Sequence, residues 1–186
     1  MDTTTDPTGP RSARRMVYRA TERRLTGPMR DFLDEHTFAV LATHAADGRM
    51  HVVPVTYLFD GGDNGRAGAL IHIATSSASL KARNIAARPD VTVTVDDRST
   101  QSWVSATGTA RIVTGPASRD LNERLYLRTW GADALAVLGP FLHRTEDVTI
   151  TITPTSWRAW DLRSTLVPAL ADAGVAPAAL ERLFGP

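Results

Sequence analysis

The segment around the only lysine of this chain combines residue types that bind anions. Of the 21 basic residues, Lys81 alone is a lysine, and it lies in IATSSASLKARNIAARP, residues 73–89. A strand that runs directly into a helix here exposes unpaired backbone N–H groups at the positive end of the helix dipole. The hydroxyls of Thr75, Ser76 and Ser79, the ammonium of Lys81 and the amide of Asn84 add polar groups near that end. This set suits a phosphate monoester or a carboxylate. An ordinary N-cap at Ser76 or Ser77, followed by a solvated lysine and a surface Asn84, has the same pattern.

A second unusual feature is a proline inside a segment with strand patterning. HVVPVTYLF, residues 51–59, alternates like a β-strand, but Pro54 has no N–H for a sheet ladder. Proline is tolerated at a sheet edge or at a bulge, and an irregular strand leaves the main chain of Val53, Val55 and Thr56 free to contact a planar ligand. An ordinary edge strand also explains Pro54 without any ligand.

The elements that must position these residues follow from the hydrophobic pattern. A hairpin with its turn at Asp47-Gly48 is predicted over residues 38–59, and the helix after the serine cluster stops before Pro89. The other predicted strands cover residues 69–75, 90–97, 102–113 and 148–162, and the other predicted helices cover residues 27–36, 116–142 and parts of 165–184. Six or seven short strands with mostly hairpin connections favour a mostly β fold, an antiparallel barrel with peripheral helices, over a doubly wound parallel sheet.

Length and composition predict one domain with two flanking segments. We expect a flexible Arg-rich arm over residues 1–26, a barrel domain over 27–163 and a helical tail over 164–186. The arm suits contact with RNA, a membrane or a partner, but it also has the composition of a solvated tail.

The same composition excludes several classes of function. A net charge of +1 predicts no general affinity for nucleic acid, and the absence of cysteine excludes disulfides and thiolate chemistry. Five scattered histidines and the absence of an HExxH motif predict no metal site. Because no apolar run approaches the ~20 residues of a membrane span, we expect a soluble, cytoplasmic protein.

Three segments together carry a resemblance to a known family. HVVPVTYLF, IATSSASLKARNIAARPDVTVTVDD and WVSATGTARIV resemble the split β-barrel fold of the pyridoxamine 5'-phosphate oxidase-like superfamily over roughly residues 29–162. A serine cluster followed by Lys-x-x-Asn and a proline is similar to the branch of flavin/deazaflavin oxidoreductases, whose members often use coenzyme F420; other relatives bind FMN or haem.

This resemblance implies a homodimer with the cofactor in a groove between the subunits. Carried over by position, five residues would bind the phosphate and ribityl chain, and the strand residues Val53, Pro54, Val55 and Thr56 would line the ring. The five are Thr75, Ser76, Ser79, Lys81 and Asn84. Trp103, or Trp157 and Arg158 of the other subunit, would close the far wall.

The implied function is hydride transfer from F420, or alternatively FMN, to a small unsaturated substrate. The Arg-x-His pair of true pyridoxamine-phosphate oxidases is replaced by SWRAW, residues 156–160, which argues against that specific activity. A non-catalytic flavin- or deazaflavin-binding protein is the rival reading. Catalytic residues are not identified, and His51, His72, Tyr57 and Tyr126 are candidates for a proton donor by chemistry alone.

Overall fold

The computed structural model describes residues 24–62, 68–142 and 146–184 of the 186-residue chain. Most of the predicted Arg-rich arm, and the middle of the glycine-rich loop after Asp60, lie outside the described residues.

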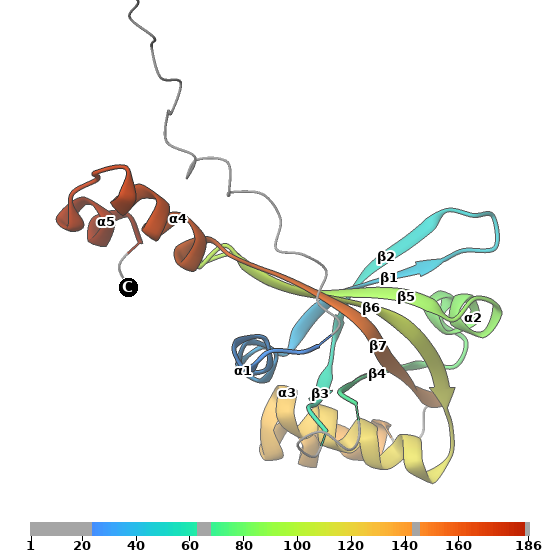
Figure 1. Cartoon of the computed structure of the whole chain (residues 1–186). Coiled ribbons are helices and arrows are strands. Elements are labelled where there is room, and N and C mark those ends of the chain that lie inside the picture. Colours follow the sequence, from blue (N-terminus) through green and yellow to red (C-terminus); the bar gives the residue numbers. More distant parts are fainter. Residues whose placement is uncertain (1–23, 63–67, 143–145, 185–186) are drawn as a thin grey trace, which may run out of the picture.

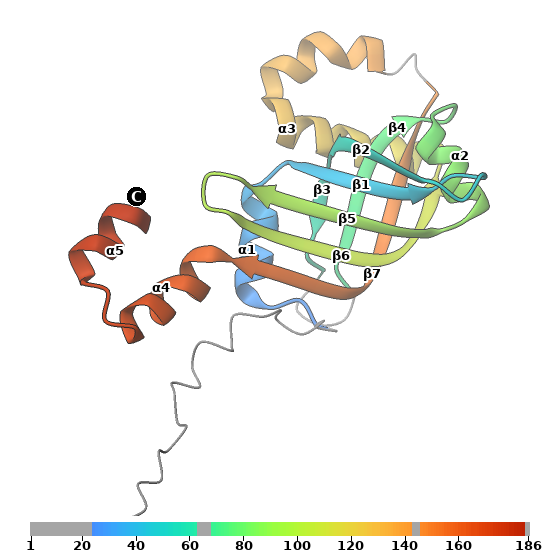
Figure 2. The same cartoon turned by 90° about the horizontal axis from the view of Figure 1, so that it is seen from above.

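A seven-stranded antiparallel sheet forms the body of the protein and curves into a half-barrel (Figures 1 and 2). Its strands lie in the order β2-β1-β5-β6-β7-β4-β3, so β2 and β3 are the two outermost strands. The strands are β1 (Phe38–His44), β2 (Met50–Thr56), β3 (Leu58–Asp60), β4 (Leu70–Ser76), β5 (Asp90–Asp97), β6 (Ser102–Val113) and β7 (Asp147–Asp161). The mostly β, antiparallel architecture expected from the sequence is therefore confirmed.

Five helices surround the sheet. They are α1 (Gly27–Glu35), α2 (Leu80–Ala87), α3 (Pro116–Leu142), α4 (Leu162–Asp172) and α5 (Pro177–Phe184). Figures 1 and 2 show α3 beside β3 and β4, whereas α4 and α5 project away from the barrel at the end of β7. No helix within the described ranges is long and apolar enough to cross a bilayer.

The long strands β6 and β7 connect the two halves of the sheet. Near its start β7 pairs with both β4 and β6, and beyond Pro154 it pairs with β6 alone, which there also pairs with β5. The register shifts between Thr107 and Gly108, where the backbones approach so closely that a Cβ on Gly108 would collide with the carbonyl oxygen of Thr153. Such a bulge bends the paired strands, and only glycine fits at this point.

The hairpin of β1 and β2 forms as predicted, with Gly48 at φ 84° in its turn. The predicted second strand is, however, two strands. At Tyr57 the chain leaves β1 and continues as β3 against β4, because the Tyr57 N–H donates to the Thr37 carbonyl (3.0 Å) and its hydroxyl donates to the Leu33 carbonyl (2.8 Å). The strand-like alternation continues through this junction, so the pattern alone does not mark it.

Two further details of the helices differ from the sequence prediction. The segment 116–142 is two helices joined at Gly131, whose φ 80° and ψ 172° are not helical. Pro168, which the pattern places at a helix break, lies inside α4, and the break falls at Gly174 instead, where φ is 85°. Glycine is the residue that most readily adopts a positive φ, which explains why both helix breaks occur at a glycine.

The alternation of the strands separates a core from an apolar outer face. Inward-facing residues of β1, β4, β5 and β7, such as Leu41, Ile73, Val93 and Ile150, are fully buried. On the opposite face, β1 and β2 expose Phe38 (64% exposed), Met50 and Val52 (57%). We call this surface, with the neighbouring Pro54, the β1–β2 outer face.

Candidate functional site

The predicted anion-binding residues meet at the junction between β4 and α2. Ser79 has extended backbone angles and is the N-cap of α2, since its Oγ accepts a hydrogen bond from the Ala82 N–H (3.3 Å). The helix ends as predicted before Pro89, with Arg88 in an extended conformation. By helix geometry, the N–H groups of Leu80 and Lys81 have no intrahelical acceptor and remain available to an anion.

The hydroxyls of the junction are arranged so that two of them can donate outward. Thr75 donates to the Ser79 Oγ (3.1 Å), which therefore accepts two hydrogen bonds and retains its own proton. The Ser76 Oγ accepts from the Ala78 N–H (3.2 Å) and likewise retains its proton. Thr75 is buried and positions Ser79, whereas the side chain of Ser76 is exposed.

Lys81 is half-buried in the first turn of α2. Burial lowers the pKa of its ammonium below the ordinary value for lysine, because desolvation disfavours the charged form. Within the described ranges no carboxylate forms an ion pair with it. A cation that is partly desolvated and has no internal partner gains from an anionic ligand.

Asn84 has a structural partner. It is buried, and its Nδ2 donates to the Thr43 Oγ1 of β1 (3.0 Å). The same Thr43 hydroxyl lies 3.5 Å from the Nδ1 of His51, at the start of β2. The hydrogen bond between Asn84 and Thr43 holds α2 against β1, and the contact between Thr43 and His51 brings the start of β2 close to them. Ligand binding by Asn84 stays a prediction.

The four predicted residues of β2 occupy the outermost strand of the sheet. Pro54 pairs with Val40 in an unbroken register, so the proline is tolerated at a sheet edge and not at a bulge. Val53 and Val55 face the barrel interior, whereas Pro54 and Thr56 lie on the outer-face side of the strand. Cofactor binding by these four residues stays a prediction.

The other candidate residues divide into core and surface. Trp157 is 4% exposed and packs in the core of its own chain, opposite Ala106, so it does not close a groove. Trp103 lies on β6 opposite Trp160, outside that core. Arg158 pairs in register with Ser105 on β6 and is exposed.

Two of the proposed proton donors are structural. Tyr57 is fully buried, and burial raises its pKa above the ordinary tyrosine value. His72 is buried with Nδ1 3.0 Å from the Thr151 Oγ1, and burial lowers its pKa. Neither side chain reaches the β4–α2 junction through a recorded hydrogen bond.

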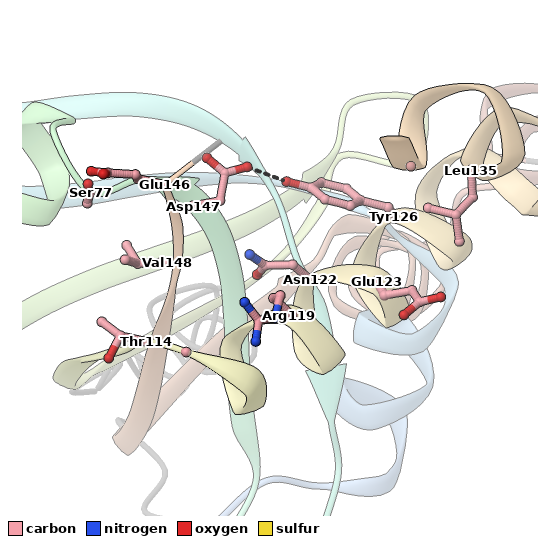
Figure 3. A pocket seen from close by; sticks show the side chains of 12 residues that line it. Ser77, Thr114, Arg119, Asn122, Glu123, Tyr126, Leu135, Glu146, Asp147 and Val148 are labelled. Atoms are coloured by element: carbon pink, nitrogen blue, oxygen red, sulfur yellow. Dashed lines mark hydrogen bonds between the residues drawn. The ribbon is translucent and has the colours of Figure 1, made fainter. Parts of the chain in front are cut away.

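Sequence reasoning missed a cavity on the other side of this junction. Figure 3 shows the side chains that line it, between α3 and the start of β7. Its volume is about 390 Å³. Its wall includes Ser77, whose N–H donates to the Glu146 carbonyl (3.0 Å), and Tyr126, whose hydroxyl donates to the Asp147 carboxylate (3.4 Å). None of the nine predicted cofactor-binding residues lines it. The helical pattern over residues 116–142 gives no signal of the cavity, because it continues through Gly131, where the helix breaks.

Comparison with known proteins gives a family match over most of the chain. The family model described as pyridoxamine 5'-phosphate oxidase matches residues 25–161. A search of curated proteins found no match.

Several solved structures have similar folds. A conserved hypothetical protein from Mycobacterium tuberculosis is 25% identical, with a TM-score of 0.63 over 78% of this chain and 89% of that one. A protein described as an F420 reductase is 22% identical, with a TM-score of 0.56 over 72% and 98% of the two chains. An FMN-binding protein related to pyridoxamine 5'-phosphate oxidase, from Nostoc punctiforme, is 14% identical, with a TM-score of 0.54 over 75% and 87%. The last two show likeness of fold alone.

Proposed function

The chain belongs to the pyridoxamine 5'-phosphate oxidase-like family of flavin-binding oxidoreductases, and from this premise we propose that it is a deazaflavin-dependent reductase that binds coenzyme F420 at the β4–α2 junction. The observation that carries the proposal is Lys81, a half-buried ammonium with no acidic partner among the described residues, beside free donors of a helix start. FMN is the alternative cofactor, since a fold neighbour is described as FMN-binding.

The residues of the junction fit a phosphate group. Lys81 would supply the positive charge, the N–H groups of Leu80 and Lys81 would donate from the helix start, and the hydroxyls of Ser76 and Ser79 have protons free for a phosphate oxygen. Thr75 would act indirectly by fixing the Ser79 hydroxyl. This arrangement needs no movement of the backbone.

The ring of the cofactor would lie against the edge strand β2. The main chain of Thr56 and the ring of Pro54 would hold it in place, with Val53 and Val55 beside them, and the strand has no neighbour on its outer side in the described chain. When bound, a reduced deazaflavin supplies a hydride for an unsaturated acceptor such as an enone or imine. The protein's part is to orient the two reactants and exclude water.

We do not extend the proposal to pyridoxamine 5'-phosphate oxidation. The segment SWRAW at residues 156–160 lacks the Arg-x-His pair that the resemblance associates with that substrate. Trp157 in this segment is a core residue, so its side chain is not available to a substrate.

We also propose that the active form is a homodimer joined through the β1–β2 outer face. Phe38, Met50 and Val52 are each more than half exposed there, and a second copy would remove this apolar surface from water and complete a groove beside β2. Val52→Glu should convert a dimer into a monomer in light scattering, whereas Leu183→Glu on the distant helix α5 should not. A wild-type monomer at micromolar concentration would contradict the dimer.

The catalytic part of the proposal is tested by turnover. Protein loaded with reduced F420 is mixed with a panel of enones and imines, and oxidation of the deazaflavin is followed by absorbance. The enzyme should oxidise the cofactor faster with an acceptor present than without one. A rate that no acceptor changes, despite tight cofactor binding, would favour a non-catalytic binding protein.

A further inference from the structure

The cavity between α3 and β7 is built by the break in α3. Gly131 separates the two halves of the helix, and Leu135 of the second half lines the cavity with Asn122 and Tyr126 of the first half (Figure 3). Gly139 of the second half also lines it. Val148 of β7 forms another part of the wall. At about 390 Å³ the cavity lies within the usual ~300–1,000 Å³ of small-molecule sites.

Charges of both signs line this cavity: Arg119 is its basic residue, and Glu123, Glu146 and Asp147 are its acidic ones. Arg119 extends into it from the first turns of α3, and within the described residues its guanidinium has no hydrogen-bond or ion-pair partner. The Asp147 carboxylate stands on the β7 side and accepts a hydrogen bond from the Tyr126 hydroxyl at 3.4 Å. Side chains of opposite charge that line one cavity and do not pair with each other are complementary to a ligand that carries both a positive and a negative group.

A buried amide with a free donor also points into the cavity. Asn122 is 6% exposed, and its Oδ1 accepts a short hydrogen bond from the Thr149 Oγ1 (2.6 Å). Its Nδ2 has no hydrogen-bond partner among the described residues. The fully buried side-chain atoms without a partner in the described residues belong to His72 and Arg128, so the Asn122 Nδ2 is not sealed off in this way. Figure 3 shows this nitrogen turned toward the cavity, near Arg119. A buried N–H₂ group in this position requires an acceptor from a ligand or from water.

The apolar part of the wall defines the rest of the ligand. Leu135, Val148 and the ring of Tyr126 line the cavity, and a Cβ built on buried Gly139 would meet no atom within 4 Å. The space beside Gly139 is therefore open and mostly bounded by carbon.

We propose that this cavity binds a free amino acid with an apolar side chain. Arg119 and Asn122 would hold its carboxylate, Asp147 would hold its ammonium, and the side chain would occupy the space beside Leu135 and Gly139. The site is separate from the proposed cofactor site, since the two share only the turn that contains Ser76 and Ser77, and it does not depend on the proposed function.

The test is calorimetric titration of the full-length protein with L-phenylalanine. A ligand of this size in a formed pocket should bind with a Kd of about 1 mM or lower. Two analogues separate the charges, because phenethylamine lacks the carboxylate and 3-phenylpropionate lacks the ammonium. Each analogue should bind at least about tenfold more weakly than phenylalanine, the usual effect of losing one charge-assisted contact.

Matched variants locate the binding. Arg119→Gln and Asp147→Asn should each weaken phenylalanine binding about tenfold or more, and Arg119→Gln should leave phenethylamine binding unchanged. Arg163→Gln and Asp172→Asn on α4 are the controls and should bind like the wild type. Arg119 is exposed and its guanidinium has no hydrogen-bond or ion-pair partner among the described residues, so we expect its variant to fold even if the Asp147 variant is unstable. No heat of binding at ~10 mM phenylalanine, equal binding of either analogue, or normal binding by Arg119→Gln would overturn the proposal.

Discussion

Replacing Lys81 by alanine should weaken phosphate binding and leave the fold intact. The ammonium is half-buried and has no acidic partner among the described residues, so its removal breaks no internal ion pair. Its pKa is already lowered by desolvation, and alanine is a better helix former at this position. We therefore expect a free energy of unfolding that is unchanged or slightly higher than that of the wild type.

The expected loss of affinity follows from one charge-assisted hydrogen bond. Such a bond contributes about 1.5–3 kcal/mol, which corresponds to roughly a 10- to 150-fold increase in Kd. The assay is a calorimetric comparison of FMN with riboflavin, which carries the same ring without the phosphate. Lys81→Ala should raise the Kd of FMN by this factor and leave the Kd of riboflavin unchanged.

Two further variants sharpen this comparison. Arg88→Ala removes a cation from the other end of α2, and it should leave FMN binding unaffected because that end presents carbonyl groups. Lys81→Met keeps most of the aliphatic stem and should behave like Lys81→Ala. If FMN affinity survives the loss of the ammonium, or if riboflavin loses affinity equally, the phosphate is not bound by Lys81.

Three predictions concern the elements around the site. Thr43→Val should lower the free energy of unfolding by about 1–3 kcal/mol in urea titration, because it leaves the buried Asn84 amide without its 3.0 Å acceptor; an unchanged midpoint would refute that role. Gly131→Ala should cost about 1–3 kcal/mol in the same assay, since an L-residue is strained at φ 80° and ψ 172°, and a neutral result would show that α3 does not need this angle. Burial holds the folded-state pKa of His72 below its ordinary ~6.5, so the unfolded chain takes up the proton first as pH falls. The contribution of His72 to stability is therefore full above pH ~6.5 and is lost as pH falls toward the folded-state pKa. His72→Gln should flatten this decline in the free energy of unfolding and His44→Gln should not, and equal slopes for the two variants would exclude His72 as its cause.

Local patterns were sufficient for much of the fold. The hairpin turn at Asp47-Gly48 and the stop of α2 before Pro89 both depend on backbone preferences of the residues concerned, and the structure confirms them. A serine N-cap was predictable at this helix start, but the N-cap is Ser79 and not Ser76 or Ser77 as expected.

Features that depend on distant partners were not predictable from one sequence. The strand break at Tyr57 depends on the carbonyl groups of Leu33 and Thr37, which come from α1 and the turn after it. The engagement of Asn84 with Thr43 joins residues 41 positions apart in the sequence. The cavity beside β7 requires the two halves of α3 to fold together at Gly131, and a uniform helical pattern over 116–142 gives no sign of that contact.

The most direct test of the central claim is a side-by-side titration of the purified protein with coenzyme F420 and FMN. Wild-type protein should bind F420 more tightly than FMN, and Lys81→Ala should lose affinity for both while Arg88→Ala keeps it. Preference for FMN would place the protein among FMN-dependent oxidoreductases, with the β4–α2 junction still as the cofactor site. Binding of neither cofactor would contradict the account and leave Lys81 as an ordinary residue at the start of a helix.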